Sequence, residues 1–127
     1  MKHLSVVAGL LLAMVSRAGA FEPQQLVGEW GGEWSASAQR GDLYITIKKV
    51  DADRVEGTVY IRGPQRYHNR DLPFVGKLEG SRFTATVPTM PGEPQVQLAF
   101  DVNAEATQMQ GTAVGRGRAD VTLTKKK

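Results

Sequence analysis

Residues 26–34, Leu-Val-Gly-Glu-Trp-Gly-Gly-Glu-Trp, decide the fold of this 127-residue chain. Every second position of the stretch holds an apolar or small residue: Leu26, Gly28, Trp30, Gly32 and Trp34. Glu29 and Glu33 fall on the opposite face, and this period of two is typical of a β-strand with one buried side. We therefore predict that the indoles of Trp30 and Trp34 point into the protein core.

The same alternation recurs seven more times, with turn-forming residues between the runs. The inward residues of these predicted strands lie at 43–47, 55–61, 74–78, 83–87, 96–102, 109–113 and 119–123. The connections at 51–53, 79–81 and 103–105 are short, which makes consecutive strands hairpin partners, and only 63–73 is expected to be long. The predicted fold is all-β with no helix: an eight-stranded antiparallel up-and-down barrel that closes on its apolar face. A β-sandwich of the same strands is the alternative.

Residues 1–20 are predicted to be a secretion signal that is removed. A basic start precedes an apolar run at 4–15, and Ala-Gly-Ala at 18–20 is the small-x-small pattern at which a signal peptidase cleaves. A membrane anchor is the alternative, but a spanning helix needs about 20 apolar residues, more than this run provides. We expect a periplasmic or secreted protein with a single domain at 21–127. Since the chain has no cysteine, no disulfide holds it together.

The charge of the mature chain argues against a nucleic-acid partner. Lys2 and Arg17 leave with the signal, so 14 basic residues remain against 13 acidic ones. Three of the basic residues are the terminal lysines at 125–127, and nucleic-acid binding needs a concentrated basic face. The strands are also shorter than the roughly 9 to 11 residues of a membrane barrel, and their polar residues must face outward. We expect a soluble protein with no membrane span after cleavage.

The Gly28-x-Trp30 pair on the first strand of an exported eight-strand meander resembles the calycin group, which includes the lipocalins and avidins. In avidins the likeness covers most of the mature length, in the order Gly57-Thr58, 74–80 and 96–102. Avidins carry an asparagine two residues after the first-strand Trp, where this chain has Gly32, and biotin-stacking tryptophans in later strands, which this chain lacks. Compared with lipocalins, the chain is short and lacks the disulfide and the terminal helix. The resemblance implies the barrel, but neither biotin binding nor lipocalin ligand chemistry.

The predicted inward positions combine very large side chains with glycines, which leaves two interpretations of the interior. In the first, Gly57, Gly76 and Gly111 make room for the indoles and the core is solid, because packed interiors are the rule and voids are costly. In the second, the glycines leave a cavity that binds a small apolar ligand. The candidate ligand-binding residues are Trp30, Trp34, Phe74, Phe83, Phe100 and Met109.

The richest polar stretch is the predicted loop at 63–73, and long loops on a rigid barrel often carry recognition. The candidate partner-binding residues are Arg66, Tyr67, His68 and Arg70, since paired arginines hold carboxylates or phosphates. A second candidate surface combines Arg40 with Arg116 and Arg118. Because His68 is the one histidine left after signal cleavage, a multi-histidine metal site is ruled out and a Ser-His-Asp triad is disfavoured. We predict no metal, no cofactor, no catalytic residue and no enzymatic activity.

The sequence thus predicts an exported, soluble, non-enzymatic barrel that binds a small apolar ligand. The alternative is a protein-protein interaction or inhibitor module that uses the 63–73 loop. A ligand carrier requires an enclosed cavity of about 300 Å³ or more touching Trp30 or Trp34. An interaction module instead requires a filled interior and an exposed Tyr67 between Arg66 and Arg70.

Overall fold

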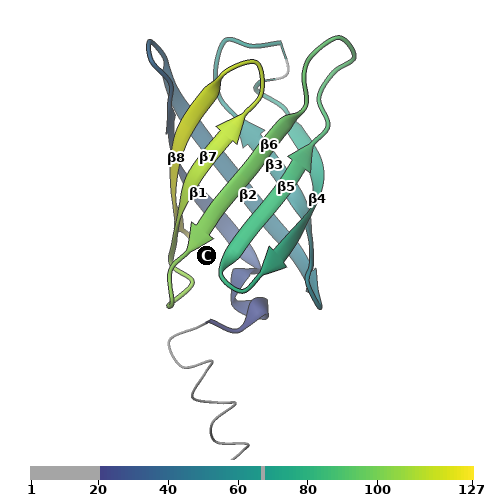
Figure 1. The fold of residues 1–127 in the computed structure, drawn as a ribbon, viewed down its shortest axis with the longest axis vertical. Helices are drawn as coiled ribbons and strands as arrows, with labels where there is room; N and C mark the ends of the chain where they lie inside the picture. The colour runs from purple at the N-terminus through teal and green to yellow at the C-terminus, as the bar shows by residue number, and fades with distance from the viewer. Residues whose placement is uncertain (1–20, 67) are drawn as a thin grey trace, which may run out of the picture.

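The computed structural model describes residues 21–66 and 68–127, so the predicted signal peptide lies outside the described residues. The described chain forms one closed barrel (Figure 1). Its strands are β1 (Gly28–Ser35), β2 (Arg40–Asp51), β3 (Arg54–Ile61), β4 (Asp71–Glu79), β5 (Arg82–Val87), β6 (Val96–Val102), β7 (Gln108–Val114) and β8 (Arg118–Lys125). Each strand pairs antiparallel with the next, and β8 pairs with β1. The predicted up-and-down barrel is confirmed, and the closed ladder excludes the β-sandwich.

The inward face of β1 carries the two tryptophans, as the alternation predicts. Trp30 is 1 % exposed and Trp34 is 6 % exposed, whereas Glu29 and Glu33 are exposed. The ladder between β1 and β8 runs from Trp30 opposite Lys125 to Ser35 opposite Asp120. Because this ladder removes the two free edges of the sheet, every strand is paired on both sides and one apolar face becomes the core.

Two glycines on the inner side are required by the close approach of neighbouring strands. A Cβ on Gly32 would lie 1.8 Å from the Thr122 carbonyl oxygen, and a Cβ on Gly111 would lie 1.8 Å from the Ala99 carbonyl oxygen. Real Cβ atoms do not approach backbone that closely, so any other residue would force the strands apart. These glycines therefore serve the coiling of the sheet more directly than they make room for the indoles.

The register of β2 against β3 shifts between Ile47 and Lys49, so that Lys48 is left without a partner. Such a β-bulge inserts one extra residue into the strand, so the side chains after it point to the opposite faces of the sheet from those that the alternation would give. Here the reversal keeps Val50 buried after the inward run that ends at Ile47. The bulge explains how a strand of 12 residues stays amphipathic along its whole length.

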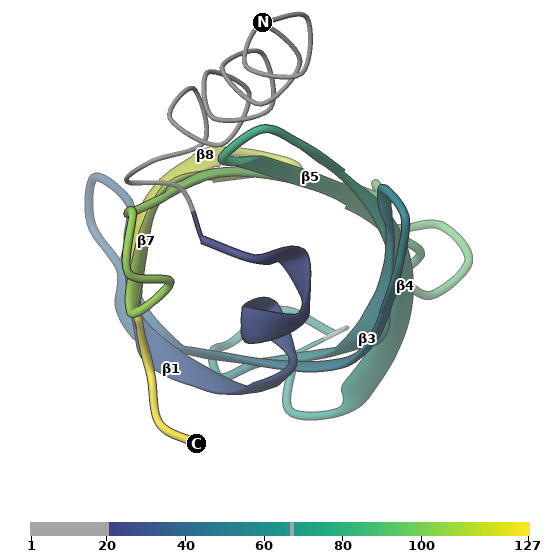
Figure 2. The same ribbon diagram turned by 90° about the horizontal axis from the view of Figure 1, so that it is seen from below.

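One end of the barrel is closed by a 3-10 turn, η1 (Pro23–Leu26), which the sequence analysis did not predict. Figure 2 shows η1 lying across the opening of the barrel seen from below. The Trp30 Nε1 donates to the Leu26 carbonyl oxygen at 2.9 Å, and the Gln24 amide donates to the Val50 carbonyl oxygen at 2.6 Å. Leu26 is fully buried. The turn therefore plugs the barrel with an apolar side chain.

The connections divide unequally between the two ends of the barrel (Figure 1). The plugged end carries the turns at 52–53, 80–81 and 103–107, which confirms the three predicted hairpins. The open end carries 36–39, 62–70, 88–95 and 115–117. The prediction that only 63–73 is long was wrong, because 88–95 is a second long connection, and residues 71–73 already belong to β4.

The ladder between β4 and β5 is short near the open end. It begins at Val75 opposite Thr86, and the same register would bring Phe74 opposite Val87 and then Pro73 opposite Pro88. Neither proline has a backbone N–H to donate, so the two strands diverge there. Among the described residues, no helix is long and apolar enough to cross a bilayer.

Candidate functional site

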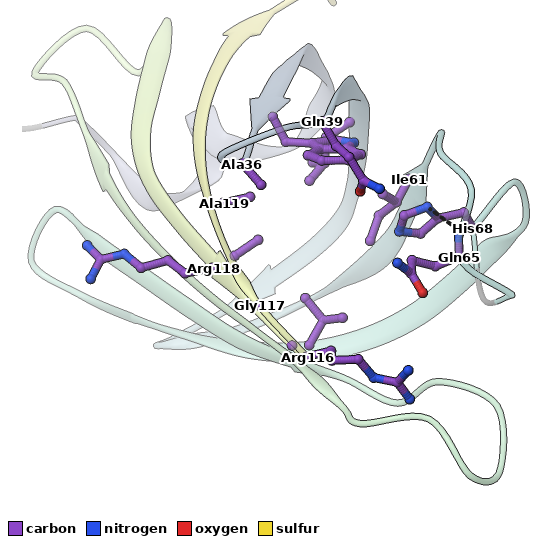
Figure 3. Close-up of a pocket in the computed structure, with 14 residues that line it drawn as sticks. Ala36, Gln39, Ile61, Gln65, His68, Arg116, Gly117, Arg118 and Ala119 are labelled. Atoms are coloured by element: carbon purple, nitrogen blue, oxygen red, sulfur yellow. Dashed lines mark hydrogen bonds between the residues drawn. The ribbon is translucent and has the colours of Figure 1, made fainter.

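A pocket of about 120 Å³ lies at the open end of the barrel (Figure 3). Its apolar wall comes from Trp34, Leu43, Ile61, Val96, Ala113 and Ala119. Ala113 and Ala119 pair directly across β7 and β8. Because these two strands present alanines at the level where β2, β3 and β6 present Leu, Ile and Val, the barrel is hollow on one side of its mouth. The pocket is therefore a property of side-chain size at the strand ends.

Trp34 and His68 form one wall of the pocket. Their ring centroids lie 5.9 Å apart at a tilt of 54°, and the Trp34 Nε1 donates to the Arg62 carbonyl oxygen at 3.1 Å. Gly63 allows this arrangement, because a Cβ there would lie 2.3 Å from the His68 Nδ1 and 3.0 Å from the Trp34 ring. The indole from a rigid strand thus supports an imidazole from a loop.

The 62–70 loop is folded back so that His68 reaches the barrel interior. The Gln65 backbone N–H donates to the His68 Nδ1 at 3.2 Å, and the His68 N–H donates to the Gln65 carbonyl oxygen at 3.0 Å. Asn69 adopts a φ of 65° and donates its backbone N–H to the Ile61 carbonyl oxygen at 2.7 Å. Its side-chain amide donates to the Gly63 carbonyl oxygen at 2.9 Å. The loop therefore holds a defined shape through local hydrogen bonds.

His68 is 8 % exposed, although it lies in a loop. Desolvation by burial lowers the pKa of His68 below its ordinary value of 6.5, and a hydrogen bond with the Gly63 backbone opposes the shift. The imidazole is therefore neutral at neutral pH. A neutral ring suits an apolar pocket wall, whereas a charged ring would pay a desolvation cost there.

The rim of the pocket is polar and holds two glutamine amides beside Arg116 and Arg118. Gln39 and Gln65 extend their amides over the mouth from two different loops (Figure 3). Within residues 21–66 and 68–127, neither side-chain amide makes a hydrogen bond. Arg116 contacts Glu93 at 3.4 Å, which ties the 115–117 turn to the 88–95 loop. The mouth thus offers two amide groups that each donate and accept hydrogen bonds.

The structure distributes the six predicted ligand-binding residues over different places. Trp34 lines the open-end pocket. Trp30, Phe83, Phe100 and Met109 are at most 1 % exposed and lie in the core. The rings of Phe83 and Phe100 are 6.1 Å apart, and Phe74 packs on Phe83 at 5.7 Å. These side chains fill the barrel below the pocket.

The predicted partner-binding residues all belong to the 62–70 loop at the open end. His68 lines the pocket, whereas Arg66 and Arg70 are exposed. Tyr67 lies outside the described residues. The second predicted group also reaches this end: Arg116 and Arg118 line the pocket edge, and Arg40 begins β2.

Sequence reasoning missed the two glutamines and the alanines that shape the pocket. Gln39 was given no role, and Gln65 was counted only among the polar residues of the 63–73 loop. A signal was present for the alanines, since Ala113 and Ala119 were both placed on the inward face. Reading side-chain volume along that face would have indicated a hollow at this end.

A second depression lies on the outer wall, with a volume of about 750 Å³ that is widely open to solvent. It follows the diverging part of β4 and β5 and is lined by Pro73, Val75 and Pro88, beside Lys48 and Lys49 of the β2 bulge. Val75 is 51 % exposed. Phe74 also contributes to this surface, so one predicted ligand-binding residue borders the outer wall.

Among the described residues, no three His, Asp or Glu side chains gather as a metal site requires. No protein-family model, curated protein or solved structure matches this chain. The resemblance to avidins and lipocalins therefore stays a prediction from sequence pattern. Function has to be argued from the geometry of the open end.

Proposed function

We propose that this protein is an exported, non-enzymatic interaction module that binds a polypeptide partner through the open end of its barrel. The observation that carries the proposal is the combination of a core filled with buried side chains and a pocket of about 120 Å³ at the mouth. Four connections surround this mouth, whereas the opposite end is plugged by η1. Rigid barrels commonly carry recognition on such loops.

The size of the pocket favours one side chain as its occupant. An apolar cavity of roughly 150 Å³ holds a benzene molecule, whereas pockets for drug-sized ligands span about 300 to 1,000 Å³. At about 120 Å³, the open-end pocket fits a leucine or phenylalanine side chain and is too small for an enclosed carrier cavity. A pocket of this size therefore favours the interaction module over the small-molecule carrier.

The rim supports a peptide as the source of that side chain. The Gln39 and Gln65 amides present a donor and an acceptor each, and a peptide bond needs both when it is partly desolvated. A hydrocarbon ligand would leave these amides without new partners. The neutral imidazole of His68 adds apolar contact area without introducing a charge.

A small apolar molecule is the second candidate occupant, and one observation favours it. Trp34 contributes an aromatic face to the pocket beside aliphatic side chains, a lining that also suits a free aromatic compound of benzene size. A peptide would gain affinity from hydrogen bonds to the Gln39 and Gln65 amides, whereas a small apolar molecule would not.

The experiment is an NMR titration of the ¹⁵N-labelled mature protein with two kinds of probe. The first is a set of blocked tripeptides with a central Leu or Phe, and the second is toluene or indole. We expect the peptides to bind more tightly and to shift the amide signals of Gln65, His68 and Ala119. Ala119→Phe should abolish binding by filling the pocket, whereas Ala104→Phe, on an exposed turn at the plugged end, should leave it unchanged.

Equal affinity for toluene or indole and for the peptides would favour the small-molecule carrier instead. Shifts confined to the plugged end, or no shifts with any probe, would contradict the open end as the binding site.

A further inference from the structure

Arginine and lysine are segregated along the barrel axis. Of the eight arginines in the described residues, six lie on the open-end connections or at the first residue of the strand that follows: Arg40, Arg62, Arg66, Arg70, Arg116 and Arg118. None of the six lysines lies there, since three are on the barrel wall and three at the C-terminal end. Such segregation is relevant to binding, because arginine is enriched and lysine depleted at protein interfaces.

Only two of these six guanidinium groups have a carboxylate partner within the described residues. Arg62 contacts Asp42 at 3.2 Å, and Arg116 contacts Glu93 at 3.4 Å. The other four, Arg40, Arg66, Arg70 and Arg118, form no ion pair in the part of the chain that the structure describes.

Three more carboxylates lie near this end and reduce its positive charge. Glu33 and Asp120 share an outer depression with Arg40, and Asp71 follows Arg70 in the chain. The 62–70 connection contains no acidic residue, and its Arg66 adjoins Gln65 at the pocket rim. Arg66 and Arg70 therefore carry positive charge that no ion pair in the described part of the chain neutralises.

We propose that the partner of the open end is an acidic peptide segment that places one apolar side chain in the pocket and its flanking carboxylates on the surrounding arginines. This inference rests on the proposed function and adds the chemistry of the partner. The planar fork of arginine binds a carboxylate through two hydrogen bonds, and complementary charge speeds association.

The arrangement of the arginines predicts where the acidic residues stand in the partner. Figure 3 shows Arg116 and Arg118 leaving the pocket edge in different directions. Arg66 and Arg70 belong to the loop that supplies His68, on the other side of the mouth. Cations on both sides of the pocket fit a peptide in which acidic residues precede and follow the apolar residue.

The test is fluorescence anisotropy with blocked, fluorescein-labelled nonapeptides and the mature protein. Three peptides share a central Leu and carry acidic, neutral polar or lysine flanks, and a fourth has acidic flanks around a central Ser. We expect the acidic peptide with Leu to bind most tightly and to weaken as salt rises. Arg66→Gln with Arg70→Gln should weaken its binding by about tenfold, since each exposed charge contact contributes up to about fivefold.

The matched control is Lys48→Gln with Lys49→Gln, which removes the same charge from the outer wall and should change affinity by less than about twofold. Ala119→Phe should abolish binding of the acidic and the neutral Leu peptides alike.

Several outcomes would overturn the inference. If the neutral Leu peptide binds as tightly as the acidic one, the charge argument fails and the pocket proposal stands. If the acidic peptide with Ser binds as tightly as that with Leu, attraction is merely electrostatic and the pocket has no part in it. If phenylacetate displaces the acidic peptide with equal affinity, the occupant is a small acid. Failure of every peptide to bind would remove the proposed function as well.

Discussion

The two tryptophans provide a matched pair of substitutions, Trp30→Phe and Trp34→Phe, that tests the division between core and mouth. In both cases the indole N–H donates to a backbone carbonyl oxygen, of Leu26 at 2.9 Å and of Arg62 at 3.1 Å. The first bond is buried between side chains that are 0 to 1 % exposed, whereas the second lies at the partly open end. The chemical change is the same, so the difference in cost reports the surroundings.

The expected costs follow from those surroundings. Trp30→Phe leaves the Leu26 carbonyl without its donor in a dry site, at about 1 to 3 kcal/mol, and adds about 1 kcal/mol for the smaller ring in a packed core. Trp34→Phe should cost only about 1 kcal/mol, because water can reach the Arg62 carbonyl from the open mouth. A domain of this size loses about 4 to 8 °C of Tm per kcal/mol, so at about 5 °C per kcal/mol we expect Tm losses of about 15 °C for Trp30→Phe and about 5 °C for Trp34→Phe.

The measurement is the Tm of the mature protein and both variants by circular dichroism, with the free energy of unfolding from urea titration as a second value. The same variants separate the two fluorescence signals, since Trp30→Phe leaves Trp34 as the sole tryptophan. Equal losses for the two substitutions, or a larger loss for Trp34→Phe, would refute the placement of the pocket at Trp34.

Two further predictions concern His68. Because burial lowers the pKa of His68 in the folded protein, the unfolded chain takes up a proton first as the pH falls. The contribution of neutral His68 to stability is therefore complete above pH 6.5 and is lost as the pH falls towards the folded-state pKa. His68→Gln should flatten the dependence of Tm on pH in that window, and an unchanged slope would assign the dependence to other groups. Gly63→Ala should expel His68 from beside Trp34 and return the pKa of His68 towards 6.5 in an NMR titration. Gly117→Ala, which has open space around its Cβ, should leave the pKa of His68 unchanged. An unchanged pKa of His68 in Gly63→Ala would contradict the packing of His68 against Gly63 and Trp34.

The barrel itself could be predicted because its determinants are local and periodic. Alternation placed all eight strands, and the turn residues at 52–53 and 80–81 identified the hairpins. The plug was missed because a 3-10 turn such as Pro23–Leu26 has no period to detect, and its place depends on the distant acceptor at Val50. The second long connection at 88–95 was overlooked although the predicted strands at 83–87 and 96–102 already left these residues, with three prolines and one glycine, between them.

The pocket was harder to predict than the fold, because it is formed by small side chains and not by chemically reactive ones. The large inward side chains were identified correctly as inward, but Phe83, Phe100 and Met109 fill the core instead of lining the pocket. What makes the hollow is the pairing of Ala113 with Ala119, and register pairs of that kind appear only when strands are placed side by side. Sequence alone gives residue types along a strand but not the volume that they enclose together.

The plugged end and the core are rigid, whereas the pocket at the open end depends partly on a loop. The wall that Trp34 and His68 share has two kinds of support, because Trp34 lies on a paired strand whereas the imidazole of His68 comes from a loop held by bonds within itself. Loops of this kind open at a lower free energy than strands that are paired on both sides. An occupant that contacts both rings would therefore stabilise the loop in this position, and protonation of His68 at acidic pH would oppose binding. The affinity of the open end should thus decrease as the pH is lowered, even for an uncharged peptide. Because an uncharged peptide makes no ion pair, this pH dependence reports the contribution of the loop and not that of the surrounding arginines.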